Sequence, residues 1–96
     1  MKMVLVAYNE AIDEEVMSAL KACAIRGFTK WTKVLGSGVA SEPHMLTNIW
    51  PKANNVVAVA VEDAQAAQLL DHVRRLRKTL GREGVKAFVL PLESMT

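Results

Sequence analysis

The sequence predicts an α+β fold in the order strand, helix, strand, strand, helix, strand, and three observations support it. Residues 3–8, rich in Val and Leu, and residues 56–61, all Val and Ala, are almost continuously apolar, as in strands buried on both faces. Each is followed by apolar side chains at helical spacing. Two further strand-like segments, 28–35 and 85–90, complete the order. This is the ferredoxin-like βαββαβ pattern, which we expect to form a four-stranded antiparallel sheet with two helices on one face.

The predicted first helix follows the strand of residues 3–8, with Asn9 as its cap and Gly27 at its end. Acidic residues in its first turn suit the helix dipole, and they are Asp13, Glu14 and Glu15. Its apolar stripe is expected to consist of Ile12, Val16, Leu20 and Cys23, with Ala19 and Ala24 beside them. This helix should therefore pack its stripe on the sheet.

The rest of the chain alternates between regular segments and one long connection. Residues 28–35 alternate polar and apolar side chains, which is typical of an exposed or edge strand. Glycines, prolines and asparagines break any periodicity over residues 36–55, and such long loops are often functional. The second helix should begin near Glu62 or Asp63 and end at Gly81, with an apolar stripe of Ala66, Leu69, Leu70, Val73, Leu76 and Leu80. Pro91 should end the last strand.

The second face of the sheet needs a cover that one chain does not provide. In two split strand-helix-strand units, strands 3–8 and 56–61 lie centrally, and strands 28–35 and 85–90 form the edges. Two helices cover one face only, yet both central strands are apolar at both alternating sets of positions. Monomers rarely expose so large an apolar surface, so we expect a homo-oligomer built through the sheet face. The alternative is that the many alanines leave this face only mildly apolar.

Composition narrows the possible functions. The 96 residues suffice for a single domain, 1–96, and carry a net charge of +2 with basic residues spread from Lys2 to Lys86. The sequence has no long basic run, and its central strands contain no aromatic residue except Tyr8. Both absences argue against nucleic-acid binding. The single cysteine cannot form an internal disulfide, and no apolar run is long enough to span a membrane. We therefore expect a cytoplasmic protein without direct membrane insertion.

No set of residues points to catalysis. Cys23 belongs to an apolar stripe, where a buried hydrophobe is more common than a nucleophile. The histidines, His44 and His72, have no serine or cysteine in a recognisable nucleophile motif beside them. We expect no enzyme and no catalytic residues. A divalent-metal site at His44 with Glu42 is the alternative interpretation of the loop, against a solvated loop histidine.

Two glycine-containing turns could approach an anion with their backbone N–H groups. Gly36-Ser37-Gly38 follows the second strand, and Gly81-Arg82-Glu83-Gly84 precedes the fourth. Arg82 and Lys86 could supply positive charge for phosphate oxygens. Neither segment matches a Walker P-loop or a dinucleotide fingerprint, and each alone is more often just a turn.

Several segments along nearly the whole chain resemble the PII-like signalling proteins of the nitrogen regulatory protein P-II family. They are Ile12-Asp13-Glu14-Glu15-Val16, Gly27-Phe28-Thr29, Leu35-Gly36-Ser37-Gly38 and Gly84-Val85-Lys86-Ala87-Phe88-Val89-Leu90-Pro91-Leu92-Glu93. The resemblance implies a homotrimer that binds adenine nucleotides in clefts between subunits. It places Thr29 near the base, Gly36, Ser37 and Gly38 at the loop root, and Gly81, Arg82, Gly84 and Lys86 around the phosphates. The long loop would contact a partner protein, with His44 and Trp50 as candidate contacts. The alternative for Trp50 is that it packs back on the trimer.

The sequence also departs from the family. Val39-Ala40 stands where regulators of nitrogen metabolism carry an arginine-glutamine pair, which argues against 2-oxoglutarate sensing. Gly84-Val85-Lys86 stands where the family usually has Gly-Asp-Gly-Lys. We therefore expect a non-enzymatic homotrimeric regulator that requires no cofactor and binds an adenine nucleotide as effector. It would act on an unidentified protein, which can be soluble or membrane-bound. The alternative is a trimeric protein similar to the CutA group that binds a divalent metal through His44.

Overall fold

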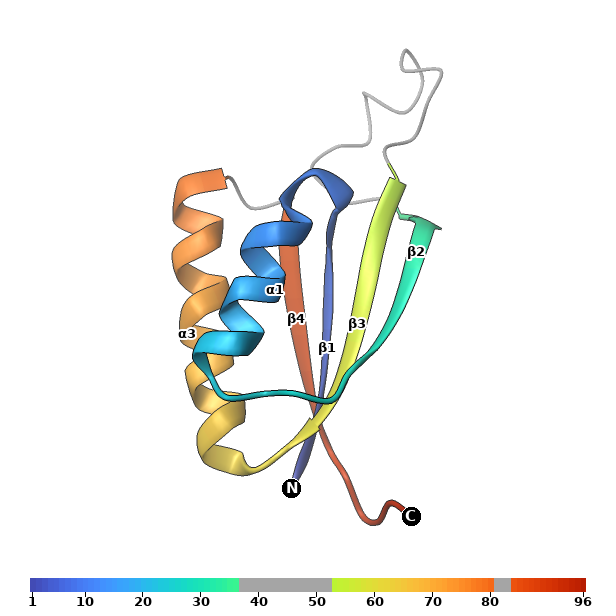
Figure 1. The fold of residues 1–96 in the computed structure, drawn as a ribbon, viewed down its shortest axis with the longest axis vertical. Helices are drawn as coiled ribbons and strands as arrows, with labels where there is room; N and C mark the ends of the chain where they lie inside the picture. Colours follow the sequence, from blue (N-terminus) through green and yellow to red (C-terminus); the bar gives the residue numbers. More distant parts are fainter. Residues whose placement is uncertain (37–52, 81–83) are drawn as a thin grey trace.

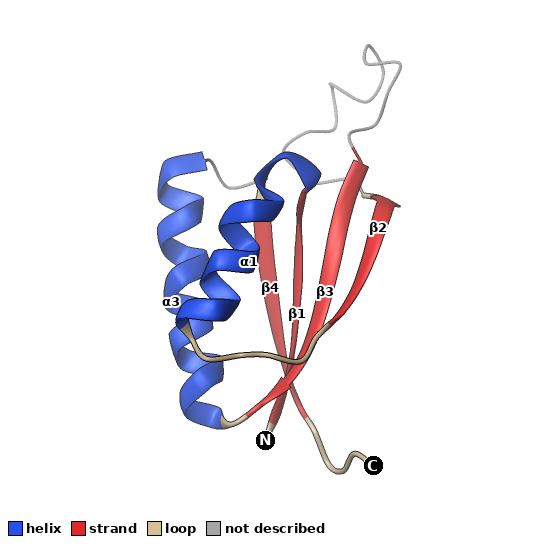
Figure 2. Ribbon diagram, viewed as in Figure 1, coloured by secondary structure: helices blue, strands red, loops and turns tan. Residues whose placement is uncertain are grey.

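The computed structural model describes residues 1–36, 53–80 and 84–96 and contains the expected order of elements (Figure 1). Strand β1 (Lys2–Asn9) leads through a 3₁₀ turn (Glu10–Ile12) into helix α1 (Asp13–Ala22). Strands β2 (Thr29–Leu35) and β3 (Ala53–Val61) follow, then helix α3 (Asp63–Leu80) and strand β4 (Val85–Pro91). The four strands pair antiparallel in the order β2-β3-β1-β4, with both helices on one side of the sheet (Figure 2). The predicted ferredoxin-like fold, with the two most apolar strands at the centre, is confirmed.

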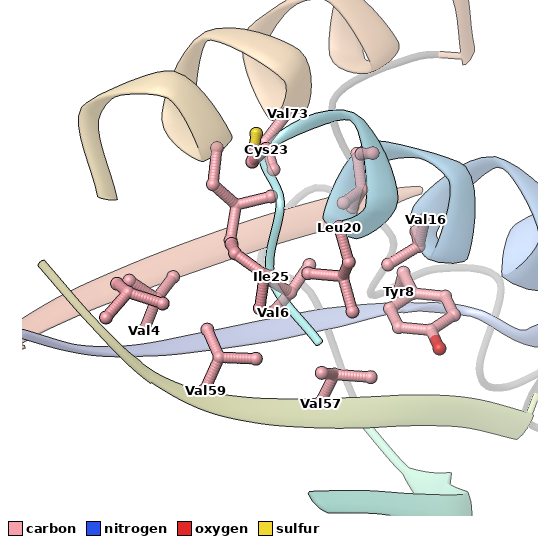
Figure 3. Close-up of a cluster of buried hydrophobic side chains, with 14 of the residues drawn as sticks. Val4, Val6, Tyr8, Val16, Leu20, Cys23, Ile25, Val57, Val59 and Val73 are labelled. Atoms are coloured by element: carbon pink, nitrogen blue, oxygen red, sulfur yellow. The ribbon is translucent and has the colours of Figure 1, made fainter. Parts of the chain in front are cut away.

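The core lies between the sheet and the helices. Val4, Val6 and Tyr8 of β1 are almost completely buried, while the residues between them are only half-buried. Val57 and Val59 of β3 face the same side, and α1 adds Val16 and Leu20 (Figure 3). In α3 the centre of the predicted stripe is buried, at Ala66, Leu69 and Val73. Each such aliphatic side chain contributes about 1.5–3 kcal/mol when it leaves water, so this layer contact supplies much of the stability of the chain.

Helix α1 ends earlier than predicted, and the prediction that Gly27 ends it is wrong. Its last residue is Ala22, and Ala24 adopts the left-handed conformation with a φ of 58°. The Ile25 N–H donates to the Leu20 carbonyl at 2.9 Å, and the Ala24 N–H donates to the Lys21 carbonyl at 3.0 Å. These two bonds form a Schellman motif with alanine at the position that glycine usually occupies. Burial of Ile25 in the core holds the chain in this strained turn.

Strand β2 contains a bulge that the sequence pattern does not predict. Its register with β3 shifts between Trp31 and Val34, and Lys33 adopts a left-handed φ of 57°. Trp31 pairs with Val56 and Val34 pairs with Asn54, so Trp31 and Val34 face the same side of the sheet. The expected strict alternation over residues 28–35 is therefore wrong beyond Trp31.

The long connection is shorter than the predicted range 36–55. Strand β3 begins at Ala53, so the last three residues of that range belong to the sheet. Asn54 pairs with Asn9 of β1, and Asn55 is buried on the helix side. Residues 37–52 lie outside the described ranges.

The other face of the sheet, here called the open face, is apolar and has no cover within one described chain. Paired residues of neighbouring strands share a face, so the register assigns Leu5, Ala58 and Phe88 to one row across it. Phe88 is 53% exposed, Leu90 is 43% exposed and Trp31 is 50% exposed. The described apolar members of the open face are Met3, Leu5, Ala7, Trp31, Val34, Val56, Ala58, Ala60, Phe88 and Leu90.

Replacing Ala24 by glycine should stabilise the protein. A left-handed alanine costs about 1–2 kcal/mol, and glycine adopts this conformation without that cost but loses more entropy on folding. We expect a net gain of about 0.5–1 kcal/mol in the free energy of unfolding. Denaturant titrations at one fixed protomer concentration measure it.

Gly27→Ala is the matched control. Gly27 has no left-handed φ, and an added Cβ would meet nothing within 4 Å. This variant should keep or slightly raise the stability, because alanine restricts the unfolded chain. If Gly27→Ala lowers the free energy of unfolding by about 1 kcal/mol and Ala24→Gly does not raise it, the left-handed residue is Gly27 and not Ala24.

Candidate functional site

The residues that the sequence associates with a nucleotide lie at the two edge strands of the described chain, with Thr29 and Gly36 at opposite ends of β2. Thr29 is the exposed first residue of β2, and Gly36 directly follows the end of that strand. Gly84 directly precedes β4, and Lys86 is an exposed residue near its start. We call these pairs the β2 half-site and the β4 half-site. Ser37, Gly38, Gly81 and Arg82 lie outside the described residues.

The two half-sites are at opposite edges of the sheet. Lys86 pairs with Ala7 of β1, which pairs with Val56 of β3, which pairs with Trp31 of β2. Three strand spacings separate the ends of this row, or about 14 Å. The structure therefore brings Thr29 and Gly36 to one edge and Gly84 and Lys86 to the other, and it does not join the described half-sites within one chain.

Backbone contacts fix the start of the β4 half-site. The Asn9 N–H at the end of β1 donates to the Gly84 carbonyl at 2.9 Å. From α3, Arg77 Nη1 donates to the Val85 carbonyl at 3.2 Å. Lys86 follows directly, and its pairing with Ala7 puts it on the open face. Its ammonium group is thus carried by a backbone that two other elements hold.

In the β2 half-site, Gly36 lies close to the end of a β3 side chain. A Cβ added to Gly36 would lie 2.7 Å from Asn54 Nδ2, closer than real Cβ contacts. Asn54 is the second residue of β3 and pairs with Val34. The ends of β2 and β3 thus approach each other closely where the chain leaves the sheet at Gly36.

A polar cluster that the sequence analysis missed lies beneath this end of the sheet. The Asp13 carboxylate accepts from Tyr8 Oη at 2.5 Å, from Lys30 Nζ at 3.0 and 3.1 Å, and from Asn55 Nδ2 at 3.2 Å. Its donors come from β1, β2 and β3, and Asp13 is the first residue of α1. The helix dipole explains an acidic residue at this position without any tertiary partner, so no local pattern pointed to these contacts. The one available signal was Tyr8, whose hydroxyl needs a partner when it ends a buried strand.

The cluster shifts the pKa values of Asp13 and Tyr8 in opposite directions. The Tyr8 hydrogen bond, helped by those from Lys30 and Asn55, holds the pKa of Asp13 below its ordinary value of 3.8, against the effect of burial. Burial and the bond to Asp13 raise the pKa of the Tyr8 phenol far above its usual value. The hydrogen bonds of the cluster therefore join the start of α1 to β1, β2 and β3.

Other candidate groups find no site in the described chain. Burial raises the pKa of the Cys23 thiol, as expected for a core residue. No group of three or more His, Cys, Asp or Glu side chains in residues 1–36, 53–80 and 84–96 could hold a metal ion. The metal candidates His44 and Glu42, and the candidate partner contact Trp50, lie outside these ranges. Neither described helix is long and apolar enough to cross a membrane.

A groove of about 570 Å³ lies on the helix layer and is separate from both half-sites. It runs between α1 and α3, with Glu14 and Glu15 on the α1 side and His72 and Arg75 on the α3 side. None of the described nucleotide candidates lines it. The charged side chains that line it, Glu14, Glu15 and Arg75, are exposed on the helices and not on the sheet.

Comparison with known proteins agrees with the architecture. The family model described as Nitrogen regulatory protein P-II matches residues 1–96. No curated protein matches the chain.

Solved structures of PII-like proteins have the same fold. CPII from Thiomonas intermedia K12, a nitrogen regulatory PII-like protein bound to ADP, AMP and bicarbonate, is 20% identical with a TM-score of 0.72, covering 93% of this chain and 82% of that one. Its apo form is 17% identical with a TM-score of 0.71, covering 93% and 85%. A PII-like signalling protein from Thermus thermophilus is 19% identical with a TM-score of 0.64, covering 93% and 83%.

Replacing Asp13 by asparagine should destabilise the fold at neutral pH but not in acid. At pH 7 the loss of a charged acceptor for three donors should lower the free energy of unfolding by about 1–3 kcal/mol. Because folding lowers the pKa of Asp13, its contribution is complete above 3.8 and disappears as the pH falls through the lower folded value. Denaturant titrations from pH 7 down to about pH 2.5 should show the two proteins converging.

Asp71→Asn is the control for this series. Asp71 accepts from Arg74 at 3.0 Å on the surface, where its side chain is 62% exposed. Loss of such a pair should change the stability by less than about 0.5 kcal/mol at every pH. An Asp13→Asn deficit that stays constant down to the lowest pH would show that the charge of Asp13 is not the stabilising feature.

Proposed function

The chain belongs to the nitrogen regulatory protein P-II family, and on that premise we propose that it is a non-enzymatic, homotrimeric signalling protein whose effector is an adenine nucleotide. The observation that carries the proposal is the separation of the two half-sites on opposite edges of one sheet. A single ligand can use both only where the β2 edge of one subunit meets the β4 edge of the next. Each site then contains residues of two chains.

The open face supplies the reason for assembly. Its apolar side chains form a surface that a monomer would leave in water, and a copy of the same chain offers a matching surface. Three sheets turned inward around a threefold axis cover one another and bring their edges together. This arrangement agrees with the trimers of the family and leaves both helices of each subunit on the outside.

The chemistry of the half-sites suits a nucleotide. The Lys86 ammonium offers a charge for phosphate oxygens, and the Gly84 backbone beside it has no side chain to block them. Thr29 on the facing edge offers a hydroxyl for the base. CPII, which has the same fold, was solved with ADP and AMP, and this supports the choice of an adenine nucleotide.

The output of the proposed regulator is contact with another protein, made by the long connection after β2. His44 and Trp50 are the candidate contact residues, and the partner can be soluble or membrane-bound. We propose one domain over residues 1–96 that acts in the cytoplasm, where a reduced Cys23 is expected. The Tyr8 hydroxyl and the Asp13 carboxylate are hydrogen-bonded to each other, which supports a structural role for both groups.

Leu5→Lys should dissociate the trimer. Leu5 is in the central row of the open face, between Ala58 and Phe88. A lysine there would bury an unpaired charge in the proposed interface. Native mass spectrometry and sedimentation at micromolar protomer concentration should find a trimer in the parent protein and a folded monomer in the variant.

Ala67→Lys is its control on the exposed side of α3. It introduces the same charge on the opposite layer and should leave the trimer intact. A parent protein that is itself monomeric, or a Leu5→Lys variant that stays trimeric, would contradict assembly through the open face.

Mixing two inactive variants should restore nucleotide binding. Gly36→Trp blocks the β2 half-site, and Lys86→Ala removes the charge of the β4 half-site. Each alone should weaken ADP binding about tenfold or more, because a charge-assisted contact contributes about 1.5–3 kcal/mol. In trimers assembled randomly from equal amounts of both, about one quarter of the interfaces pair two intact halves and should bind with parental affinity. Isothermal titration measures the number and affinity of these sites.

Native mass spectra must first show that both variants form trimers. Thr29→Trp, at the other end of the β2 half-site, replaces Gly36→Trp if the latter does not assemble. Mixed trimers without any restored site would place both halves of the site in one subunit. A parent protein that binds no adenine nucleotide would overturn the proposed effector.

A further inference from the structure

We propose that Lys30 and Asp13 form a positioning pair that holds the β2 half-site in place for the nucleotide. The inference rests on the proposed function, because it concerns the same site. Lys30 directly follows Thr29 in β2, and its ammonium group makes both of its described hydrogen bonds to the Asp13 carboxylate. The pair thus connects the edge strand to the start of α1.

Strand β2 needs such a connection because its pairing with β3 is interrupted. The register shift between Trp31 and Val34 lies between Thr29 and Gly36, the two described members of the half-site. Thr29 is below the bulge, and Gly36 is above it, beyond two further pairs. The hydrogen-bond ladder between β2 and β3 is therefore not continuous from Thr29 to Gly36, and backbone pairing alone does not fix these two residues relative to each other.

Side-chain burial offers β2 little other support. Within the strand only Lys30 and Val34 are partly buried, and the other five residues are exposed. In Figure 1, β2 is the edge strand farthest from α3. Lys30 reaches under the sheet to the helix side, where its side chain is 23% exposed and that of Asp13 is 34% exposed. The ion pair thus joins a side chain of β2 to the first residue of α1.

The carboxylate at the other end of the pair is itself fixed. Tyr8 of β1 and Asn55 of β3 donate to Asp13 Oδ1, so the acceptor cannot follow Lys30 if β2 moves. A charge-assisted bond to a held acceptor restricts β2 more than a pair of two mobile surface groups. Lys33 and Glu10 form such a surface pair, at 3.9 Å with side chains 79% and 47% exposed. The same strand thus provides a matched weak pair for comparison.

Holding β2 lowers the free energy that ligand binding would otherwise spend on ordering it. The β2 half-site must meet the β4 half-site of a neighbouring subunit, so a displaced edge strand misplaces one side of every site. Loss of preorganisation reduces affinity without removing any contact to the ligand. Lys30 and Asp13 would act in this way through Thr29 and Gly36.

Three substitutions separate positioning from packing. Lys30→Met keeps the aliphatic stem but loses the charge, Lys30→Arg keeps the charge, and Lys33→Met removes the weak pair. Hydrogen exchange of the Thr29–Leu35 amides in the nucleotide-free trimer measures the mobility of β2. ADP titration by calorimetry measures the affinity of the site.

Lys30→Met should speed exchange of the β2 amides about tenfold and weaken ADP binding about fivefold, and saturating ADP should slow that exchange again. Lys30→Arg and Lys33→Met should stay within about twofold of the parent protein in both measurements.

Any other outcome contradicts a defined part of the proposed positioning role. Faster exchange with unchanged ADP affinity would make the pair structural only, and unchanged exchange in Lys30→Met would refute the positioning role altogether. A defect in Lys30→Arg equal to that in Lys30→Met would exclude the ion pair as the cause. If the parent protein binds no ADP, the proposed function fails and this role with it, whereas the exchange data still decide whether the pair holds β2.

Discussion

Two helices cover one face of a four-stranded sheet, and the apolar side chains on the other face require a second cover. This constraint follows from the central strands, which carry Val4 and Val6 toward the helices and Leu5 and Ala7 away from them. The open face is not uniform. Its central strands contribute Ala7, Ala58 and Ala60 beside larger aliphatic side chains, and the large aromatic side chains Trp31 and Phe88 lie on the edge strands. Small central side chains allow other sheets to approach closely, and aromatic edges suit contacts between neighbouring subunits.

The same strand order that leaves this face open also divides the proposed nucleotide site. A βαββαβ chain with its first and third strands at the centre must carry its second and fourth strands at the edges. Gly36 after β2 and Gly84 before β4 are therefore separated by the whole width of the sheet. A ligand bound between subunits favours the assembled form over separate chains by mass action. In such a protein, effector binding stabilises the trimer, and no additional conformational change is needed for this coupling.

The sequence predicted what depends on hydrophobic periodicity and missed what depends on exceptions or on distant residues. Continuous apolar runs located β1 and β3, and helical spacing located the stripes of both helices. The left-handed turn at Ala24 gave no signal in the sequence, because alanine is not among the residues that favour that conformation, whereas the nearby Gly27 is. The bulge in β2 involves Lys33 and contains no glycine. The Asp13 cluster joins residues 8, 13, 30 and 55, which no local pattern connects.

Asp13 shows how a local and a tertiary role coexist in one residue. At the start of α1 its charge interacts favourably with the helix dipole, and that interaction needs no partner. The same charge accepts hydrogen bonds from three strands, and a partly buried carboxylate held by several donors tolerates little displacement. Apolar residues of equal volume at these positions would give comparable stability, but they would not fix the position of β2 relative to α1 through directional hydrogen bonds. The polar choice at this position therefore serves the location of β2, the strand on which one half of the proposed site depends.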